Sequence, residues 1–190
     1  MDNASQDKEY IERLREEFSK FVFILLEKNI GFGAANNIGV RKATSDYILI
    51  LNPDTIIEPA MIRDGIERLR DETIGAVAYR LIDGSGDFLE ESRRGFPSIS
   101  GGLFKFLGLD RVFPNSVFFN SYYLGSAKNS NYIDVLSGAC FFIRKKVYEE
   151  ISGFDERFFM FGEDIDLSYS LYKKGYKIYY NENIEVVHFK

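Results

Sequence analysis

The sequence predicts an α/β domain in which a mostly parallel sheet is flanked by helices. Short, continuously apolar runs such as Tyr47–Leu51 are typical of strands that are buried on both faces. Between such runs, apolar residues recur with helical spacing, as Ile62, Ile66 and Leu69 do. Strand and helix therefore alternate along the chain, which is the pattern of a layered sheet with helices packed against it.

The candidate strands are apolar runs bounded by turn-forming residues. They are residues 21–26, 47–51, 74–82, 132–136, 140–143, 176–180 and 184–187. Asn52-Pro53 ends the second run, and Asp83-Gly84-Ser85-Gly86 forms a turn after the third. We expect the runs at 21–26, 47–51, 74–82 and 140–143 to lie together in the central sheet.

Helices are expected where apolar residues recur every three or four positions. Asn3 or Ser5 is a suitable cap for a helix that carries Tyr10 and Phe18 on one face. Segment 29–39 combines glycines with small residues, so we expect a short helix that approaches the sheet closely.

Three later helices are expected. Pro59 suits the first turn of one helix, a second covers residues 145–151, and a third begins near Asp164 and ends at Gly175. Residues 93–131 mix glycine, aromatic and polar residues without a period, and we expect a long excursion whose aromatic rings either shape an acceptor site or cover the sheet edge.

Composition limits the function classes. The chain has 190 residues, of which 45% are hydrophobic and 28% charged, so it fits one domain with a core of its own. A net charge of −5 argues against a nucleic-acid surface, and a single cysteine excludes an internal disulfide. The apolar runs are too short to span a bilayer, and the polar N-terminus is not a signal peptide. We therefore expect a cytoplasmic protein.

Acidic residues at two places indicate chemistry. Asp54 follows an apolar strand, and ligands of open α/β sheets bind beyond the carboxyl ends of strands. A carboxylate there suits a divalent cation that also binds phosphate, although Asn-Pro-Asp is also ordinary turn chemistry. Glu163, Asp164 and Asp166 follow an aromatic-rich run; they either line a site or complement a helix dipole.

His188 is the single histidine and also ends a strand. A lone histidine is either structural or a ligand. The position of His188 at a strand end makes these two interpretations equally good. We expect Asp54 and His188 to approach each other near a cleft, with Asp164 at its rim. Asp2 and Asn3 are suited to hydrogen-bond a nucleotide and equally to cap a helix.

Several motifs, taken in order, resemble the inverting family-2 glycosyltransferases, and most of all the rhamnosyltransferase-like branch that builds bacterial surface polysaccharides. They are residues 29–39, Leu51-Asn52-Pro53-Asp54-Thr55, Ser137-Gly138-Ala139-Cys140, Gly153-Phe154-Asp155-Glu156 and Gly162-Glu163-Asp164-Ile165-Asp166-Leu167. The resemblance implies a GT-A fold, a nucleotide-diphosphate sugar donor, a glycan or lipid-linked acceptor, and Mg²⁺ or Mn²⁺.

The resemblance also implies roles for individual residues. Asp54 stands at the position of the metal ligand, His188 assists the metal or diphosphate, and Asp164 stands at the position of the catalytic base, with Glu163 as the second candidate. The substrate-binding candidates are Asp2, Asn3, Asn37, Asn52 and Gly138.

Compared with this family, we expect the chain to lack the first strand of the sheet and the helices that follow His188. We expect one glycosyltransferase domain over 1–190, with a nucleotide-binding half at 1–92 and an acceptor and catalytic half at 93–190. A missing strand would leave an open sheet edge that favours a homo-oligomer. Peripheral association with the inner face of the membrane is a further expectation.

Two alternatives stay open from sequence. One is a sugar-nucleotide nucleotidyltransferase, which also uses metal-bound acids on a nucleotide-binding sheet. That class normally has a glycine-rich loop with basic residues after its first strand, and no such loop is visible here. The other is a non-catalytic remnant that binds a nucleotide or a glycan.

Overall fold

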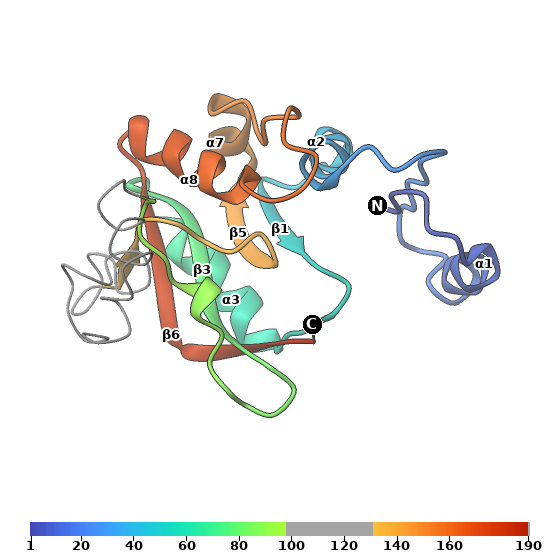
Figure 1. The fold of residues 1–190 in the computed structure, drawn as a ribbon, viewed down its shortest axis with the longest axis horizontal. Coiled ribbons are helices and arrows are strands. Elements are labelled where there is room, and N and C mark those ends of the chain that lie inside the picture. Colours follow the sequence, from blue (N-terminus) through green and yellow to red (C-terminus); the bar gives the residue numbers. More distant parts are fainter. Residues whose placement is uncertain (98–130, 190) are drawn as a thin grey trace, which may run out of the picture.

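A mixed six-stranded sheet organises the part of the chain that the computed structural model describes, residues 1–97 and 131–189 (Figure 1). The strand order is β1-β5-β3-β6-β2, and β4 pairs with β6 outside this path. The strands are β1 (Tyr47–Leu51), β2 (Thr55–Ile56), β3 (Ile74–Ile82), β4 (Tyr132–Ile133), β5 (Cys140–Arg144) and β6 (Lys177–His188).

The helices follow the predicted pattern. They are α1 (Lys8–Glu17), α2 (Phe32–Lys42), α3 (Pro59–Arg68), α7 (Lys145–Glu150) and α8 (Glu163–Lys173), with a 3₁₀ turn at Glu90–Ser92. Pro59 opens α3 as expected, and Gly175 follows α8 with a φ of +82°. The cap of α1 is Asp7, whose carboxylate accepts from the backbone N–H of Tyr10, and not Asn3 or Ser5. None of the helices in the described ranges has the length and apolarity to cross a bilayer.

The expectation of a mostly parallel sheet was wrong. Only the β3–β6 pair is parallel among the described strand pairs, whereas β1–β5, β3–β5, β2–β6 and β4–β6 are antiparallel. Strand β5 is buried along almost its whole length. A central antiparallel strand covered on both faces therefore has the same continuous apolar sequence as a parallel one, and composition cannot tell the two directions apart.

The predicted strand at 21–26 is also absent. Phe21 and Val22 are 69% and 83% exposed, and the segment forms only an isolated bridge between Leu25 and Asp2. An apolar run becomes a strand only where a neighbouring strand supplies hydrogen bonds, and this run has no strand beside it in the described sheet. The two runs at 176–180 and 184–187 are one strand, β6, with an irregular register after Asn181.

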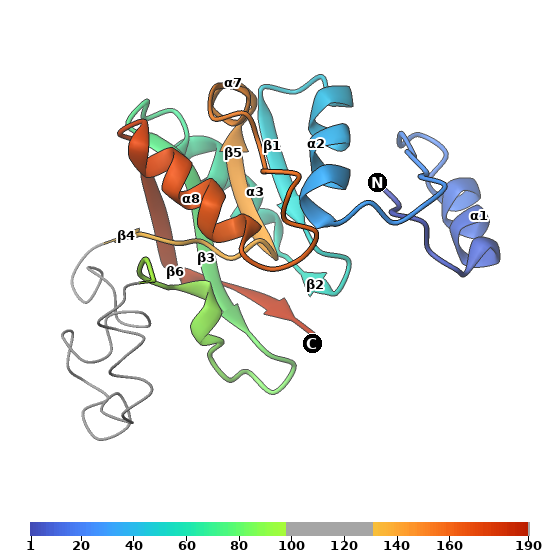
Figure 2. The same cartoon turned by 45° about the horizontal axis from the view of Figure 1, so that its top comes forward.

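Two layers of helices enclose the sheet. Along β3, Ala76 and Ala78 face one cluster of buried residues, and Val77, Tyr79 and Leu81 face the other. The first cluster includes residues of α2, α7 and α8, and the second is closed by α3, an arrangement visible in Figure 2. Strands from both halves of the sequence, β1 to β3 and β4 to β6, share this sheet and its two buried clusters.

Helix α2 packs closely on the core, as its small residues predict. A Cβ added at Gly33 would lie 2.8 Å from the Cβ of Phe154, a contact that real side chains do not make. Phe154 is itself 1% exposed and packs edge-to-face against the rings of Phe32, Phe141 and Tyr148. The glycine thus allows the helix to reach an aromatic cluster under the sheet.

Asn37 has a structural role, which argues against the substrate-binding role expected for it. The side chain is 6% exposed, and its Oδ1 accepts from the Tyr148 hydroxyl at 2.5 Å and from the Phe154 N–H at 3.0 Å. Its Nδ2 donates to the Phe154 carbonyl and to Glu156. The amide therefore joins α2 to the loop after α7 and has no hydrogen-bonding capacity left for a ligand.

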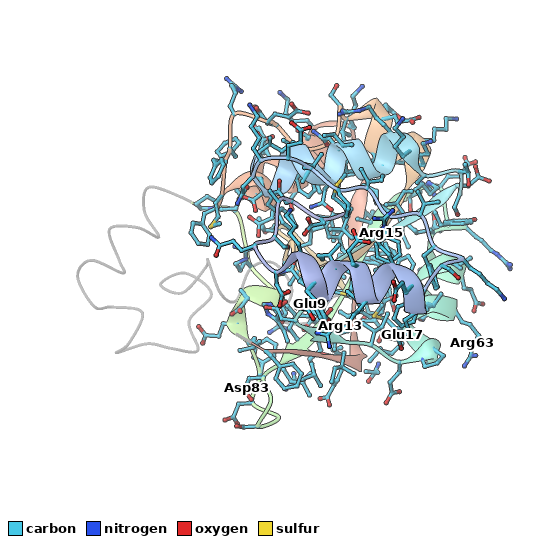
Figure 3. All side chains as sticks on the ribbon, turned by 90° about the vertical axis from the view of Figure 1, so that its right-hand side faces the viewer. Glu9, Arg13, Arg15, Glu17, Arg63 and Asp83 are labelled. Carbon is cyan, nitrogen blue, oxygen red and sulfur yellow. The ribbon has the colours of Figure 1, made fainter. Side chains whose placement is uncertain are left out.

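Strand β1 lies at an open edge of the described sheet, as expected. It ends the strand order, and a hollow of about 450 Å³ lined by β1, α2 and Met1 runs along it. Helix α1 lies apart from the sheet in both ribbon views and buries none of its residues. Figure 3 shows α1 nearest to the viewer, carrying Glu9, Arg13, Arg15 and Glu17.

We predict that Asn37→Ala lowers the free energy of unfolding by about 1–3 kcal/mol, because it leaves buried polar groups of Tyr148 and Phe154 unpaired. Urea unfolding followed by circular dichroism measures this. The matched control is Asn36→Ala in the same helix, where the amide donates to the Phe32 carbonyl on the partly exposed side. Equal losses in the two variants would contradict the structural role.

We also predict that the protein self-associates through the β1 edge, because such an edge presents unpaired N–H and C=O groups. Sedimentation velocity over a range of concentrations measures the association. Leu51→Lys, at a residue 39% exposed, should shift the protein toward monomer, whereas Ile62→Lys, at a residue 41% exposed on α3, should not. A protein that stays monomeric at every concentration would disprove the prediction.

Candidate functional site

The pairing of β2 with β6 brings Asp54 beside His188, which confirms that the two approach each other. Thr55 lies opposite His188, and the Phe189 N–H donates to the Asp54 carbonyl at 2.8 Å. As a result the His188 Nε2 atom lies 3.4 Å from Asp54 Oδ1. The His188 side chain is 12% exposed and that of Asp54 44%, so the pair sits at the surface with one side open.

This pair fits a divalent cation. A carboxylate oxygen and an imidazole nitrogen are donors that Mn²⁺ accepts, and the carboxylate also suits Mg²⁺. Two ligands at about 2.1 Å from one ion and at right angles are about 3 Å apart, close to the separation seen here. The imidazole nitrogen that faces Asp54 is Nε2. His188 Nδ1, on the other side of the ring, is buried and finds no hydrogen-bond partner in the described residues.

Two protein donors alone would hold an ion weakly. Within residues 1–97 and 131–189, no group of three or more His, Cys, Asp or Glu side chains is placed to hold a metal. An ion at Asp54 and His188 would therefore complete its coordination with water or with phosphate oxygens of a ligand, as Mg²⁺ commonly does in nucleotide sites.

Asn52 and Gly138 connect this edge of the sheet to helix α8. The Asn52 N–H donates to the Ala139 carbonyl at 2.8 Å, and the Asn52 carbonyl accepts from the Thr55 hydroxyl. A Cβ added at Gly138 would lie 3.8 Å from the Cβ of Asp164. The loop before β5 thus touches both the turn that carries Asp54 and the first turn of α8. That Asp164 lines the rim of the same cleft stays a prediction.

Asp164 is held at the start of α8 by a cation. Its Oδ2 accepts from Arg94 Nη2 at 2.5 Å, and its Oδ1 accepts from the Ile165 N–H at 2.8 Å. The side chains of Arg94 and Asp164 are 12% and 17% exposed, so the ion pair is largely shielded from water. Shielding of this degree makes the interaction much stronger than that of an exposed pair.

Sequence reasoning missed Arg94. The residue is placed by a backbone bridge with Val135, and its Nη2 also donates to the Leu136 carbonyl at 2.7 Å. The available signal was the dipeptide Arg93-Arg94 in a stretch that is otherwise rich in aromatic residues. A group of acids at a helix start needs a cation if it is partly buried, and this dipeptide was a candidate for it.

Glu163 lies deeper than Asp164. It is 9% exposed, and its Oε2 has no hydrogen-bond partner among the described residues. Burial raises the pKa of the Glu163 carboxyl, the negative charge of Asp164 adds to the effect, and Arg94 opposes it. The two neighbouring acids are therefore distinct, since Asp164 is paired with a cation and Glu163 is desolvated.

Asp2 and Asn3 make hydrogen bonds within the N-terminal segment. The Asn3 amide donates to Asn29 Oδ1 at 2.8 Å and accepts from the Ile30 N–H at 3.0 Å, which argues against a role in substrate binding. The Asp2 carboxylate accepts from Ser5 Oγ and from its N–H. A contact of Asp2 with a nucleotide base stays a prediction.

Comparison with family profiles covers the whole chain. Residues 1–152 match the profile "Glycosyl transferase family 2", and residues 119–190 match "Glycosyltransferase like family 2".

Two curated relatives are of similar closeness. The N-acetylglucosaminyl-diphospho-decaprenol L-rhamnosyltransferase of Mycobacterium tuberculosis is 28% identical over 85% of this chain and 56% of the relative. The rhamnosyltransferase WbbL of Escherichia coli K12 is 28% identical over 84% of this chain and 61% of the relative. The chain therefore spans little more than half the length of the curated relatives that it matches.

The fold agrees with these matches. The crystal structure of GalNAc-T7 with UDP, GalNAc and Mn²⁺ superposes with a TM-score of 0.67, covering all of this chain and 37% of the other at 17% identity. The GT-A fold predicted from the sequence is confirmed, as a mixed sheet with flanking helices. With a family profile matched over most of its length, this chain belongs to glycosyl transferase family 2.

Proposed function

We propose that this chain is the core of an inverting glycosyltransferase that moves a sugar from a nucleotide-diphosphate donor to a hydroxyl of a glycan or lipid-linked acceptor. The observation that carries the proposal is the Asp54–His188 pair at the sheet edge of a family-2 chain, with a second acidic group at the start of α8. The names of the two rhamnosyltransferase relatives support the transfer of a sugar, and one of them names a lipid diphosphate as the acceptor. We propose that the reaction belongs to bacterial surface polysaccharide synthesis.

Asp54 and His188 are the proposed holders of Mg²⁺ or Mn²⁺. An ion held there would supply positive charge to the donor diphosphate and to the nucleoside diphosphate leaving group. For such a site the protein would contribute a carboxylate oxygen of Asp54 on a half-exposed turn and the largely buried imidazole of His188. The Mn²⁺ bound in GalNAc-T7 supports this assignment at the level of the fold.

Asp164 is the proposed base, which takes the proton of the acceptor hydroxyl as the oxygen attacks the anomeric carbon. Arg94 donates to Asp164 Oδ2 and so fixes the direction of the carboxylate. Glu163 is the second candidate, because a raised pKa suits a proton acceptor, but its burial leaves less room for a hydroxyl to reach it. Asn52 and Gly138, which connect the two acidic positions, are the proposed substrate-contacting positions of the loop.

We also propose a division of labour, with residues 1–92 serving the nucleotide and 93–190 the acceptor. The aromatic residues of 93–131 that are expected to shape an acceptor site fall mostly outside the described residues, which include Phe96 from this set. The proposed setting is the cytoplasm at the inner face of the membrane, where a nucleotide sugar meets a lipid-linked acceptor.

We predict that two substitutions affect different properties, one the rate of sugar transfer and the other the binding of a nucleoside diphosphate. Asp164→Asn should lower transfer by about 10²–10⁴-fold, the usual contribution of a general base, and leave nucleoside diphosphate binding with Mn²⁺ unchanged. Asp54→Ala should weaken that binding with Mn²⁺ but not in its absence, because Asp54 would hold an ion that adds positive charge for the diphosphate. Calorimetric titration with UDP, GDP and dTDP, beside a transfer assay, measures both effects.

Several results would contradict these assignments. Transfer retained in Asp164→Asn would move the base to Glu163 or another group. Binding with an unchanged Mn²⁺ dependence in Asp54→Ala would remove the metal site. Release of pyrophosphate in place of a nucleoside diphosphate would indicate a nucleotidyltransferase, and nucleotide binding without turnover of any donor would indicate a non-catalytic protein.

The burial of Glu163 predicts a pH-dependent stability. Its pKa is higher in the folded than in the unfolded chain, so its contribution favours folding below the unfolded pKa and is lost as pH rises through the folded pKa. Glu163→Gln should therefore raise the melting temperature more at pH 8 than at pH 4. The control is Glu67→Gln on the exposed side of α3, which should show no such trend. A gain for Glu163→Gln that is the same at both pH values would contradict the desolvation.

A further inference from the structure

A hollow of about 420 Å³ lies at the opposite end of β1 from the Asp54–His188 pair. Tyr47, the first residue of β1, lies in its wall, whereas Asp54 comes after the end of that strand. Arg144 pairs with Tyr47 across the β1–β5 ladder and lines the same hollow. The turn after α3, the first turn of α7 and the residue before β6 complete the lining. This hollow is therefore separate from the proposed donor site.

The lining of the hollow is mainly positive. Arg70, Arg144 and Lys146 line it, against one acid, Glu72. At neutral pH these four side chains carry a net charge of +2, although the whole chain has a net charge of −5. Like charges that gather in one hollow repel one another, and a bound anion replaces that repulsion with attraction. The hollow therefore favours an anionic occupant.

Other acids near the hollow already have hydrogen-bond partners of their own. Asp71 Oδ1 accepts from the N–H and from the hydroxyl of Thr73, both at 2.8 Å. Glu150 accepts from the Tyr176 hydroxyl at 2.9 Å and lies 3.5 Å from Lys174 Nζ. The cations of the lining are thus left for a ligand.

Arg144 is held in place without losing its charge. Its Nη1 donates to the carbonyls of Leu69 and Asp71 at 2.7 and 3.0 Å, and its Nη2 donates to the Glu72 carbonyl at 3.0 Å. Carbonyl groups have no net charge, so the guanidinium stays positive. Its Nε–H and one N–H of Nη2 make no hydrogen bond with a described residue. A guanidinium fixed in this way is preorganised to receive an anion.

Arg70 and Lys146 are the adaptable cations of the hollow. Both are exposed, and neither side chain makes a hydrogen bond or an ion pair with another residue in the described ranges. They come from two separate elements, the turn after α3 and the first turn of α7. Because both side chains are long and flexible, they can close on an anion that Arg144 receives.

We propose that this hollow binds a small, water-soluble phosphomonoester, with its phosphate on the three cations. A phosphate is favoured over a carboxylate because it carries close to two negative charges, which match the net charge of the lining, and because arginine donors fit phosphate oxygens. The hollow is larger than a phosphate group, which leaves room for an organic part against Tyr47, Leu69 and Val147. The proposal does not depend on the transferase function.

Calorimetric titration with phenyl phosphate tests the proposal. EDTA keeps the donor site free of metal, and pH 8 keeps the phosphate doubly charged, because its second pKa is about 6. Phenyl sulfate is the matched control, since it has the same shape but a single negative charge. We expect phenyl phosphate to bind saturably and phenyl sulfate to bind at least about tenfold more weakly, as for the loss of a charge-assisted hydrogen bond. Inorganic phosphate should bind more weakly than phenyl phosphate, and vesicles of phosphatidic acid should not bind.

Substitutions of the exposed cations locate the ligand. Arg70→Gln and Lys146→Gln should each raise the dissociation constant of phenyl phosphate about tenfold. Neither side chain has a partner in the described part of the chain, so both variants should fold. The control Arg63→Gln, at an exposed residue of α3 outside the hollow, should not change the constant. Glu72→Gln should tighten binding, and Asp54→Ala should leave it unchanged.

Several results would overturn the proposal. Phenyl sulfate bound as tightly as phenyl phosphate would show that the charge of a phosphate is not recognised. Inorganic phosphate bound equally well would leave only an adventitious ion. A dissociation constant unchanged in both Arg70→Gln and Lys146→Gln, or binding lost in Asp54→Ala, would place the ligand elsewhere. Binding to phosphatidic acid vesicles but not to phenyl phosphate would assign the lining to a membrane surface.

Discussion

The parallel pairing of β3 with β6 is the contact on which the rest of the structure depends. β3 is buried on both faces, and β6, which is twelve residues long, pairs with it from Lys177 to Val187. The same strand pairs with β4 near its start and with β2 near its end. Because β6 is long, it carries His188 out of the core to the turn that holds Asp54. The candidate metal site is therefore a consequence of strand length and register.

In the first turn of α8, two neighbouring carboxylates differ in their partners and in their burial. Arg94 compensates Asp164 directly, whereas Glu163 points into a less hydrated position without a partner for its Oε2 among the described residues. Burial of both charges without a cation would be costly, and the arginine comes from a segment 70 positions away in sequence.

The N-terminal segment and β1 contrast with this well-packed centre. α1 buries no residue, and β1 has a strand on one side within the described sheet. The buried amide of Asn37 and the close approach at Gly33 fasten α2 to the core. The hydrophobic stabilisation is concentrated in the β3, β5 and β6 layer and weakens toward the first residues of the chain.

The sequence by itself determined the α/β class, the strands at 47–51, 74–82 and 140–143, the helix at Pro59, and the acids at a strand end and a helix start. These follow from local periodicity and turn chemistry, which need no knowledge of distant contacts. Only the tertiary structure decided strand direction, the failure of 21–26 to form a strand, the internal use of Asn37, and the Arg94–Asp164 pair. Each of these features depends on contacts between residues that are far apart in the sequence. A hydrogen bond or an ion pair needs two groups to be close in space, and the local sequence pattern does not encode that proximity.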